Sequence, residues 1–276
     1  MTRTSCPAWA FSILILASLP AVAADKQAAD GVTVIPDVAY AAGGDRQKLD
    51  LYLPKGRTDF PVVLFFHGGG FKAGDRKSAA NIGETFARRG VGVASVGYRL
   101  FPEVKHPVPA ADGAAAFAWI KKNIGTYHGR ADQIFVAGHS AGAILAAQIA
   151  TDDRYLQSAG ASTGDIRGAI LLSGTYNLPE NRTDVFGDAE ERKAASPFSH
   201  ARSGLAPFFL AYAERDNPGI EDQTKAFAAV LKAAGDETVV VLAKDRSHGT
   251  IASHVDENDP TADQALAFVK SRLDNR

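Results

Sequence analysis

The chain has 276 residues, 46% of them hydrophobic, and its 30 Lys and Arg residues nearly balance 31 Asp and Glu residues. A chain of this length and composition can bury the core of one sizeable α/β domain. The balanced charge excludes a basic field that would attract nucleic acid or an anionic membrane, so we expect neither nucleic acid nor stable membrane insertion.

Residues 1–24 have the pattern of a secretory signal peptide. Arg3 gives a positively charged start, an apolar stretch runs from Ala8 to Leu19, and Ala21-Val22-Ala23 is an A-x-A cleavage site. The alternative is a membrane anchor, for which the apolar stretch is short. We therefore expect export to the periplasm or the extracellular space, with residues 25–276 forming a single domain.

The rest of the chain shows strand-like and helix-like patterns in alternation. Strands are predicted at 33–40, 49–54, 61–66, 91–98, 133–138, 166–174, 206–213 and 237–244. Helices are predicted at 79–90, 107–124, from Ser140 onward, 221–235 and 261–273. We expect the first two strands to pair antiparallel. The alternation that follows predicts an α/β fold with a mostly parallel eight-stranded sheet, helices on both faces, and functional loops beyond the strand ends.

One of these loops holds a serine between small residues. The apolar strand at 133–138 leads without a spacer into His139-Ser140-Ala141-Gly142, and a helix-like run follows. Gly138 to Gly142 therefore match G-x-S-x-G in the strand-turn-helix context that the motif requires. Such a turn is tight, so small residues flank a serine whose hydroxyl projects from the sheet. The alternative is a serine that only caps the helix.

A glycine-rich loop follows the buried strand 61–66. It reads His67-Gly68-Gly69-Gly70-Phe71, and its glycines let backbone N–H groups approach a ligand without obstruction by Cβ atoms. Together with the N–H of Ala141, those of Gly69 and Gly70 would form an oxyanion hole. The alternative is a merely flexible loop.

The motifs HGGGF (67–71), GYRLFPE (97–103) and GHSAG (138–142) occur in an order that resembles the α/β-hydrolase superfamily. The resemblance is closer to its HGGG-containing esterases and lipases, which include hormone-sensitive-lipase-like and acetylxylan/feruloyl-esterase-like groups. It extends from about residue 33 to the C-terminus. It implies the α/β-hydrolase fold and a Ser-Asp-His triad in that chain order, with Ser140 as the nucleophile.

The acid and the base of such a triad would follow the last two strands. The resemblance favours Asp216 as the acid, and Glu214 is the alternative because it lies nearer the strand end. It favours His248 as the base, because His248-Gly249 resembles the family's His-Gly, and His254 is the alternative.

We expect substrate selectivity to come from Phe71, Phe101 and a short polar cap segment at about 175–205. This segment is too small for the apolar lid of a true lipase. The expected function is therefore a serine carboxylesterase acting on small-molecule or carbohydrate esters of short acyl or aryl acids, with acetyl and feruloyl esters of plant polysaccharide as candidates. The alternatives are a formamidase-type amide hydrolase and a non-catalytic binding module. The sequence contains no metal-site or nucleotide-binding motif, so no metal or cofactor is expected, and the oligomeric state stays open.

Overall fold

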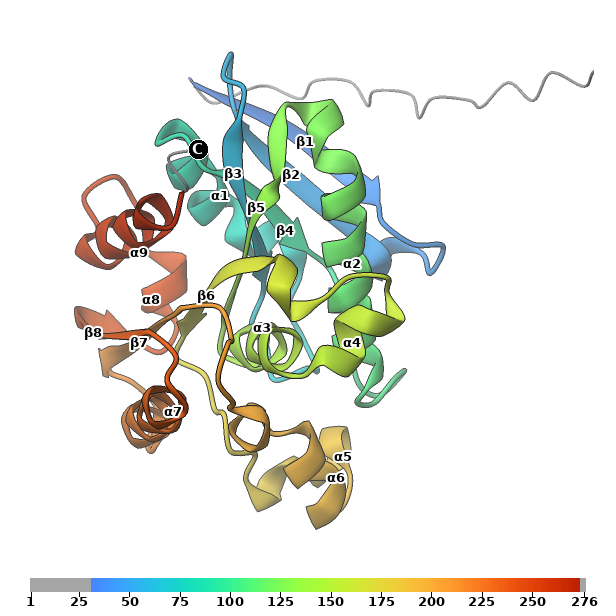
Figure 1. The fold of residues 1–276 in the computed structure, drawn as a ribbon, viewed down its shortest axis with the longest axis vertical. Helices are drawn as coiled ribbons and strands as arrows, with labels where there is room; N and C mark the ends of the chain where they lie inside the picture. The colour runs from blue at the N-terminus through green and yellow to red at the C-terminus, as the bar shows by residue number, and fades with distance from the viewer. Residues whose placement is uncertain (1–30, 274–276) are drawn as a thin grey trace, which may run out of the picture.

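The computed structural model describes residues 31–273, which build one eight-stranded sheet with the strand order β1-β2-β4-β3-β5-β6-β7-β8 (Figure 1). β1 is antiparallel to β2 and β2 is antiparallel to β4, whereas all other neighbours are parallel. The predicted mostly parallel eight-stranded sheet is confirmed. The strands are β1 Val32–Ala39, β2 Lys48–Pro54, β3 Phe60–Phe66, β4 Gly92–Val96, β5 Gly129–His139, β6 Ile166–Leu172, β7 Phe208–Arg215 and β8 Thr238–Ser247.

Helices cover both faces of the sheet, as predicted (Figure 1). The α-helices are α1 Ala80–Arg88, α2 Val108–Asn123, α3 Ala141–Thr151, α4 Asp153–Ser158, α5 Thr183–Phe186, α6 Ala189–Ala195, α7 Ile220–Ala234, α8 Thr250–Ser253 and α9 Pro260–Ser271. The 3-10 turns are η1 Asp45–Gln47, η2 Arg76–Ala79, η3 Ile124–Tyr127, η4 Thr163–Asp165, η5 Glu180–Arg182 and η6 Pro197–His200. The helices that the sequence did not predict, α4, α5, α6 and α8, have seven residues or fewer. Too few turns are available in them for a periodic apolar pattern to show.

Strand β3 explains why an uninterrupted apolar run is needed at the centre of the sheet. Val62, Leu64 and Phe66 point to the face covered by α2 and α3, and Val63 and Phe65 point to the face covered by α1 and α9. Each is at most 4% exposed. Full burial of such a side chain contributes about 1.5–3 kcal/mol, so both faces of this strand stabilise the fold.

A buried arginine ties the end of the glycine-rich loop to the antiparallel edge of the sheet. The side chain of Arg76 is only 2% exposed and pairs with three carboxylates. Its Nε donates to Asp50 Oδ1 at 3.0 Å, and its other nitrogens reach Asp37 and Asp45. A buried charge is tolerated only when it is paired in this way. Removing a partner would therefore loosen the loop that precedes η2.

The segment that connects β6 to β7 contains η5, α5, α6 and η6, and α5 and α6 project from the lower end of the molecule in Figure 1. It corresponds to the polar cap predicted at about 175–205. None of the helices within residues 31–273 is long and apolar enough to cross a membrane. The predicted signal peptide, residues 1–24, lies outside the described residues.

Candidate active site

Strand β5 passes into helix α3 through a turn in which Ser140 adopts φ 54° and ψ −117°. A positive φ is unfavourable for a residue with a side chain and persists only where the surroundings enforce it. They do so here through close backbone packing. A Cβ on Gly138 would lie 2.2 Å from the carbonyl oxygen of Gly142, and one on Gly142 would lie 2.0 Å from that of Phe66. Both glycines are therefore required for space, and the serine between them is held out of the sheet.

Three loops bring Ser140, His248 and Asp216 into one line of contacts. His248 follows β8 directly, and its Nε2 lies 2.9 Å from Ser140 Oγ. Its Nδ1 lies 2.6 Å from Oδ1 of Asp216, which follows β7 directly. A carboxylate only accepts hydrogen bonds, so Nδ1 carries the proton and Nε2 is left to accept one from the serine.

The carboxylate of Asp216 is 5% exposed and is held from both sides. Its Oδ2 accepts hydrogen bonds from Ser173 Oγ at 2.5 Å and from the Ala213 amide at 2.8 Å, and its Oδ1 accepts one from the Asn217 amide at 2.9 Å. Burial by itself raises the pKa of this carboxyl, but the hydrogen bonds from His248, Ser173 and the two amides outweigh burial and lower its pKa to about 2. The group is therefore ionised at neutral pH.

The two alternative residues lie elsewhere. Glu214 belongs to β7, which extends two residues beyond its predicted end, and its Oε2 accepts a hydrogen bond from the Asp245 amide in β8 at 3.0 Å. His254 follows α8 and is exposed. Within residues 31–273, neither side chain forms a hydrogen bond or ion pair with Ser140 or His248. The structure thus brings together Asp216 and His248 and leaves Glu214 and His254 apart from them.

His139 supports the loop that carries His248. Its Nε2 donates a hydrogen bond to the carbonyl oxygen of His248 at 2.6 Å, and the two rings lie 5.0 Å apart. Burial, followed by the proximity of the His248 charge, lowers the pKa of His139 to about 4. A neutral His139 does not compete electrostatically with His248 at physiological pH.

The glycine-rich loop runs beside the serine. A Cβ on Gly68 would lie 2.8 Å from His139 Nδ1 and 3.3 Å from the Cβ of Ser140. Gly69 and Gly70 have φ values of 116° and 66°, in the region that glycine tolerates best. In the part of the chain that the structure describes, the N–H groups of Gly69, Gly70 and Ala141 donate to no protein acceptor. These three amides are available to a ligand.

His67 packs under the glycine-rich loop and contacts Gly68 and Tyr98. Its ring is buried and stacks on Tyr98, with centroids 4.4 Å apart, and its Nδ1 lies 2.7 Å from the Gly68 carbonyl oxygen. Tyr98 in turn donates to the His67 carbonyl oxygen at 2.7 Å. Burial lowers the pKa of His67, so the imidazole is neutral and serves as packing.

The comparisons with known proteins agree with this geometry. A family described as "alpha/beta hydrolase fold" matches residues 63–193, which include both glycine motifs and Ser140. The chain has the α/β-hydrolase fold.

The relatives of this chain include a protein named as an esterase and one named as a formamidase. It is 32% identical over 228 residues to Esterase LipQ of Mycobacterium tuberculosis, with 74% of this chain and 54% of that protein covered. It is 26% identical over 258 residues to the kynurenine formamidase of Danio rerio, with 89% and 85% covered. The chain spans about half the length of the curated relatives that match first, 48% and 54%.

Among solved structures, the chain is similar to a thermophilic esterase from Thermogutta terrifontis with bound propionate. The TM-score is 0.72 at 25% sequence identity, and the match covers 87% of this chain and 94% of that one. A match over 87% of this chain extends well beyond the segment around the serine.

Phe71 and Phe101, predicted to bind substrate, differ in their environments. Phe71 is 1% exposed, with φ 63°, and its ring packs in the core against Tyr98 and, edge to face at 5.3 Å, against Phe186. Its ring is almost fully buried in this structure, and the substrate-binding role of Phe71 stays a prediction. Phe101 is half-buried, and its amide donates to the Phe71 carbonyl oxygen at 2.8 Å. The sequence did not indicate that the Phe71 ring is buried in the core.

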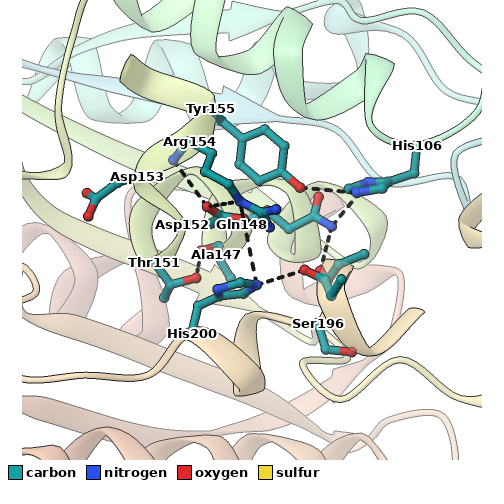
Figure 2. Close-up of polar contacts among 12 residues, drawn as sticks. His106, Ala147, Gln148, Thr151, Asp152, Asp153, Arg154, Tyr155, Ser196 and His200 are labelled. Carbon is teal, nitrogen blue, oxygen red and sulfur yellow. Dashed lines mark hydrogen bonds and ion pairs between the residues drawn. The ribbon is translucent and has the colours of Figure 1, made fainter. Parts of the chain in front are cut away.

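Polar contacts dock the segment between β6 and β7 on the helix that begins after Ser140 (Figure 2). Gln148 of α3 is 2% exposed, and its Nε2 donates to the Ala195 carbonyl oxygen at 2.8 Å and lies 3.5 Å from His106 Nδ1. The other ring nitrogen of His106 lies 3.1 Å from the Tyr155 hydroxyl. The His106 amide donates to the Val185 carbonyl oxygen at 3.0 Å. Sequence reasoning missed Gln148, although it is the only polar side chain between Gly142 and Thr151.

A second contact lies at the end of α3. Asp152 caps α4 and pairs with Arg154, and His200 of η6 places its Nε2 3.6 Å from Asp152 Oδ2 (Figure 2). Burial raises the pKa of Asp152, but the Arg154 hydrogen bonds lower it below its usual range. The ionised carboxylate thus caps its own helix and lies close to the returning end of the segment.

Proposed function

We propose that this α/β hydrolase is a serine carboxylesterase that cleaves short-acyl or aryl carboxylic esters through an acyl-enzyme. The observation that carries the proposal is the continuous line of contacts from Ser140 Oγ through the His248 imidazole to the ionised Asp216, set on a strained turn. Its similarity to proteins named as esterases supports the same reaction class.

In the first half-reaction Ser140 Oγ attacks the acyl carbonyl carbon while His248 Nε2 accepts the hydroxyl proton. Asp216 keeps the other ring nitrogen protonated and stabilises the imidazolium. The N–H groups of Gly69, Gly70 and Ala141, together with the positive end of α3, stabilise the oxyanion. The C–O bond to the alcohol then breaks, and the imidazolium returns its proton to the leaving oxygen.

In the second half-reaction water takes the place of the alcohol. His248 Nε2 accepts a proton from water as the water oxygen bonds to the acyl carbon. The bond to Ser140 Oγ breaks, and the serine oxygen recovers the proton. The acid is released, and the three residues return to their starting protonation states.

The preferred substrates in this proposal are acetyl and feruloyl esters, including those on plant polysaccharide. The segment at 175–205 is short and polar, which suits soluble esters better than long acyl chains. Export by the signal peptide at 1–24 would place the enzyme in the periplasm or outside the cell, where such polymers occur. Mass spectrometry of the exported protein is expected to find an N-terminus at Ala24 or Asp25, and full-length chain in washed membranes would contradict export.

A formamidase-type amide hydrolase is the second candidate, because one relative that matches over most of both chains is named a kynurenine formamidase. The same nucleophile and base would act on a formyl carbon. The ratio of kcat/KM for a p-nitrophenyl ester to that for N-formylkynurenine separates the two. A ratio above one supports the esterase, and a ratio well below one supports the amide hydrolase.

The test of the reaction class uses the mature protein and p-nitrophenyl esters of increasing acyl length. We expect the highest kcat/KM for acetate and butyrate. Ser140→Ala and His248→Ala are each expected to lower kcat by about 10⁴-fold or more, and the double variant no further, because the two groups act as one unit. A fluorophosphonate probe is expected to label Ser140. Undiminished turnover by Ser140→Ala would refute the mechanism. Absence of turnover by the wild-type protein on both esters and formyl amides would favour the non-catalytic binding module.

A further inference from the structure

A recess lies near the acid rather than beside the serine. It is a groove of about 570 Å³ between residues 175–181, which follow β6, and residues 218–226, which include the start of α7. The half-buried ring of Phe198 adds to its lining. A volume of this size is in the range of small-molecule sites. Nothing in the proposed mechanism uses it.

The chain places this groove close to the reacting groups. Thr175 lies two residues beyond Ser173, and Pro218 lies two residues beyond Asp216. Ser173 and Asp216 are themselves joined by a hydrogen bond of 2.5 Å. Two residues of chain span at most about 7 Å, so both walls begin next to that bond. Only the His248 imidazole separates Asp216 from Ser140. A ligand of a few linked rings could occupy the groove while an ester on it reaches the serine.

The residues that line the groove favour one chemical class of ligand. Asn177, Asn181 and Asp222 are exposed and supply amide and carboxylate groups, while Phe198 and Ile220 supply apolar surface. No lysine, arginine or histidine is among the described lining residues. An anionic ligand would find no counter-charge and would face Asp222. A neutral polyol would fit, because its hydroxyls both donate to carboxylates and accept from amides, and its C–H faces pack on apolar side chains.

Gln223 holds one wall of the groove in position. Its Oε1 accepts hydrogen bonds from the amides of Tyr176 at 3.2 Å and Asn177 at 3.0 Å, which fixes the chain after β6 against α7. Its Nε2 has no protein acceptor within residues 31–273 and belongs to a residue that lines the groove. A donor fixed before binding costs a ligand less ordering entropy.

We propose that this groove binds a neutral sugar residue on the alcohol side of the ester, so that the enzyme acts on acylated oligosaccharides. The proposal rests on the proposed esterase function for its kinetic consequence, but sugar binding itself is independent of turnover. Asn181 and Asp222 are the specificity-determining residues, because both are exposed and neither supports a buried element.

Binding is tested with the Ser140→Ala protein, which cannot turn over, by calorimetric titration with xylotetraose, cellotetraose and trigalacturonate. We expect at least one neutral oligosaccharide to bind, and trigalacturonate to bind at least tenfold more weakly. Adding Asn181→Ala or Asp222→Ala is expected to weaken binding about fivefold each, the effect of one lost hydrogen bond. Glu180→Ala is the matched control, since Glu180 is exposed beside Asn181 and does not line the groove. The proposal is overturned if neither neutral sugar binds, if trigalacturonate binds as tightly, or if Glu180→Ala weakens binding equally.

The kinetic arm compares acetylated xylotetraose with p-nitrophenyl acetate. In Asn181→Ala the ratio of the two KM values is expected to shift about fivefold against the oligosaccharide, while Glu180→Ala keeps the wild-type ratio. An unchanged ratio in Asn181→Ala would show that the alcohol lies elsewhere and would overturn the proposal. If the wild-type protein hydrolyses neither ester, the proposed function fails, and the titration alone decides whether the groove binds sugar.

Discussion

Ser173 donates a 2.5 Å hydrogen bond to the Asp216 carboxylate from the end of the neighbouring strand. Ser173 is 1% exposed and has φ 52°, and its amide donates to the Ala211 carbonyl oxygen at 2.8 Å. A strained, buried serine whose hydroxyl meets the acid orients the carboxylate toward His248. Ser173 is therefore a positioning residue for the acid.

Ser173→Ala removes a donor to a charged acceptor, so we expect the free energy of unfolding to fall by about 1.5–3 kcal/mol at neutral pH. Because the Ser173 hydrogen bond lowers the pKa of Asp216, this pKa should also rise in the variant. Urea unfolding measured between pH 2 and pH 7 reports both effects. Ser199→Ala, at an exposed serine of η6, is the control. Equal stability of the two variants would show that the hydrogen bond contributes nothing.

The assignment of the acid can be tested by two isosteric changes. Asp216→Asn leaves the shape of the site intact but favours the wrong imidazole tautomer, so we expect kcat to fall by about 10⁴-fold. Glu214→Gln should stay close to wild type, because within residues 31–273 the Glu214 carboxylate accepts a hydrogen bond only from the Asp245 amide, and it borders Arg215. Steady-state kinetics on p-nitrophenyl acetate distinguishes the two. The reverse pattern would identify Glu214 as the acid.

The depressed pKa of Asp216 also predicts how stability depends on pH. A carboxyl with a pKa near 3.9 in the unfolded chain and about 2 in the folded protein favours folding while it is ionised. Its contribution, about 2 kcal/mol, is fully present above about pH 4 and is lost as the pH falls through about 2. The gap in unfolding free energy between wild type and Asp216→Asn should therefore narrow between pH 5 and pH 2. A gap that does not change with pH would contradict the assigned pKa.

The close packing behind Ser140 predicts that a side chain at Gly142 will destabilise the fold. A Cβ on Gly142 would lie 2.0 Å from the backbone oxygen of Phe66, which cannot move without disturbing β3. We expect Gly142→Ala to cost more than about 3 kcal/mol of stability. Gly125→Ala, where nothing lies within 4 Å of the added Cβ, should be close to wild type. The two variants are compared by their soluble yield and by the urea concentration at the midpoint of unfolding. A wild-type midpoint for Gly142→Ala would show that the turn is packed less tightly than described.

We expect the hydrogen bond of Gln148 to help hold the segment between β6 and β7 in place. Gln148→Met keeps the side-chain length but leaves the Ala195 carbonyl oxygen without its donor, which should cost about 1–3 kcal/mol. Cleavage within residues 175–205 by a low concentration of protease should become faster. The exposed Gln157→Met is the control. Identical proteolysis rates for the two variants would mean that other contacts hold the segment.

Much of this fold could be predicted from local sequence. The strand at 61–66 and the serine between Gly138 and Gly142 are fixed by interactions of near neighbours: an uninterrupted apolar run for a strand buried on both faces, and small residues where a strand and a helix meet. The sheet followed from the alternation of such elements, because parallel strands need crossover helices. Boundaries were less accurate, since pairing with β8 carries β7 to Arg215.

Only the tertiary structure decided which polar groups meet. Asp216 and Glu214 are two residues apart, and the extension of β7 by two residues directs one carboxylate to His248 and the other to β8. Ser173 and Gln148 carry no motif, because their partners lie 43 and 47 residues away along the chain. Phe71 is an aromatic residue beside the glycine-rich loop, and only the structure shows that its ring packs in the core. Side-chain direction and long-range contact depend on backbone geometry that residue type alone does not encode.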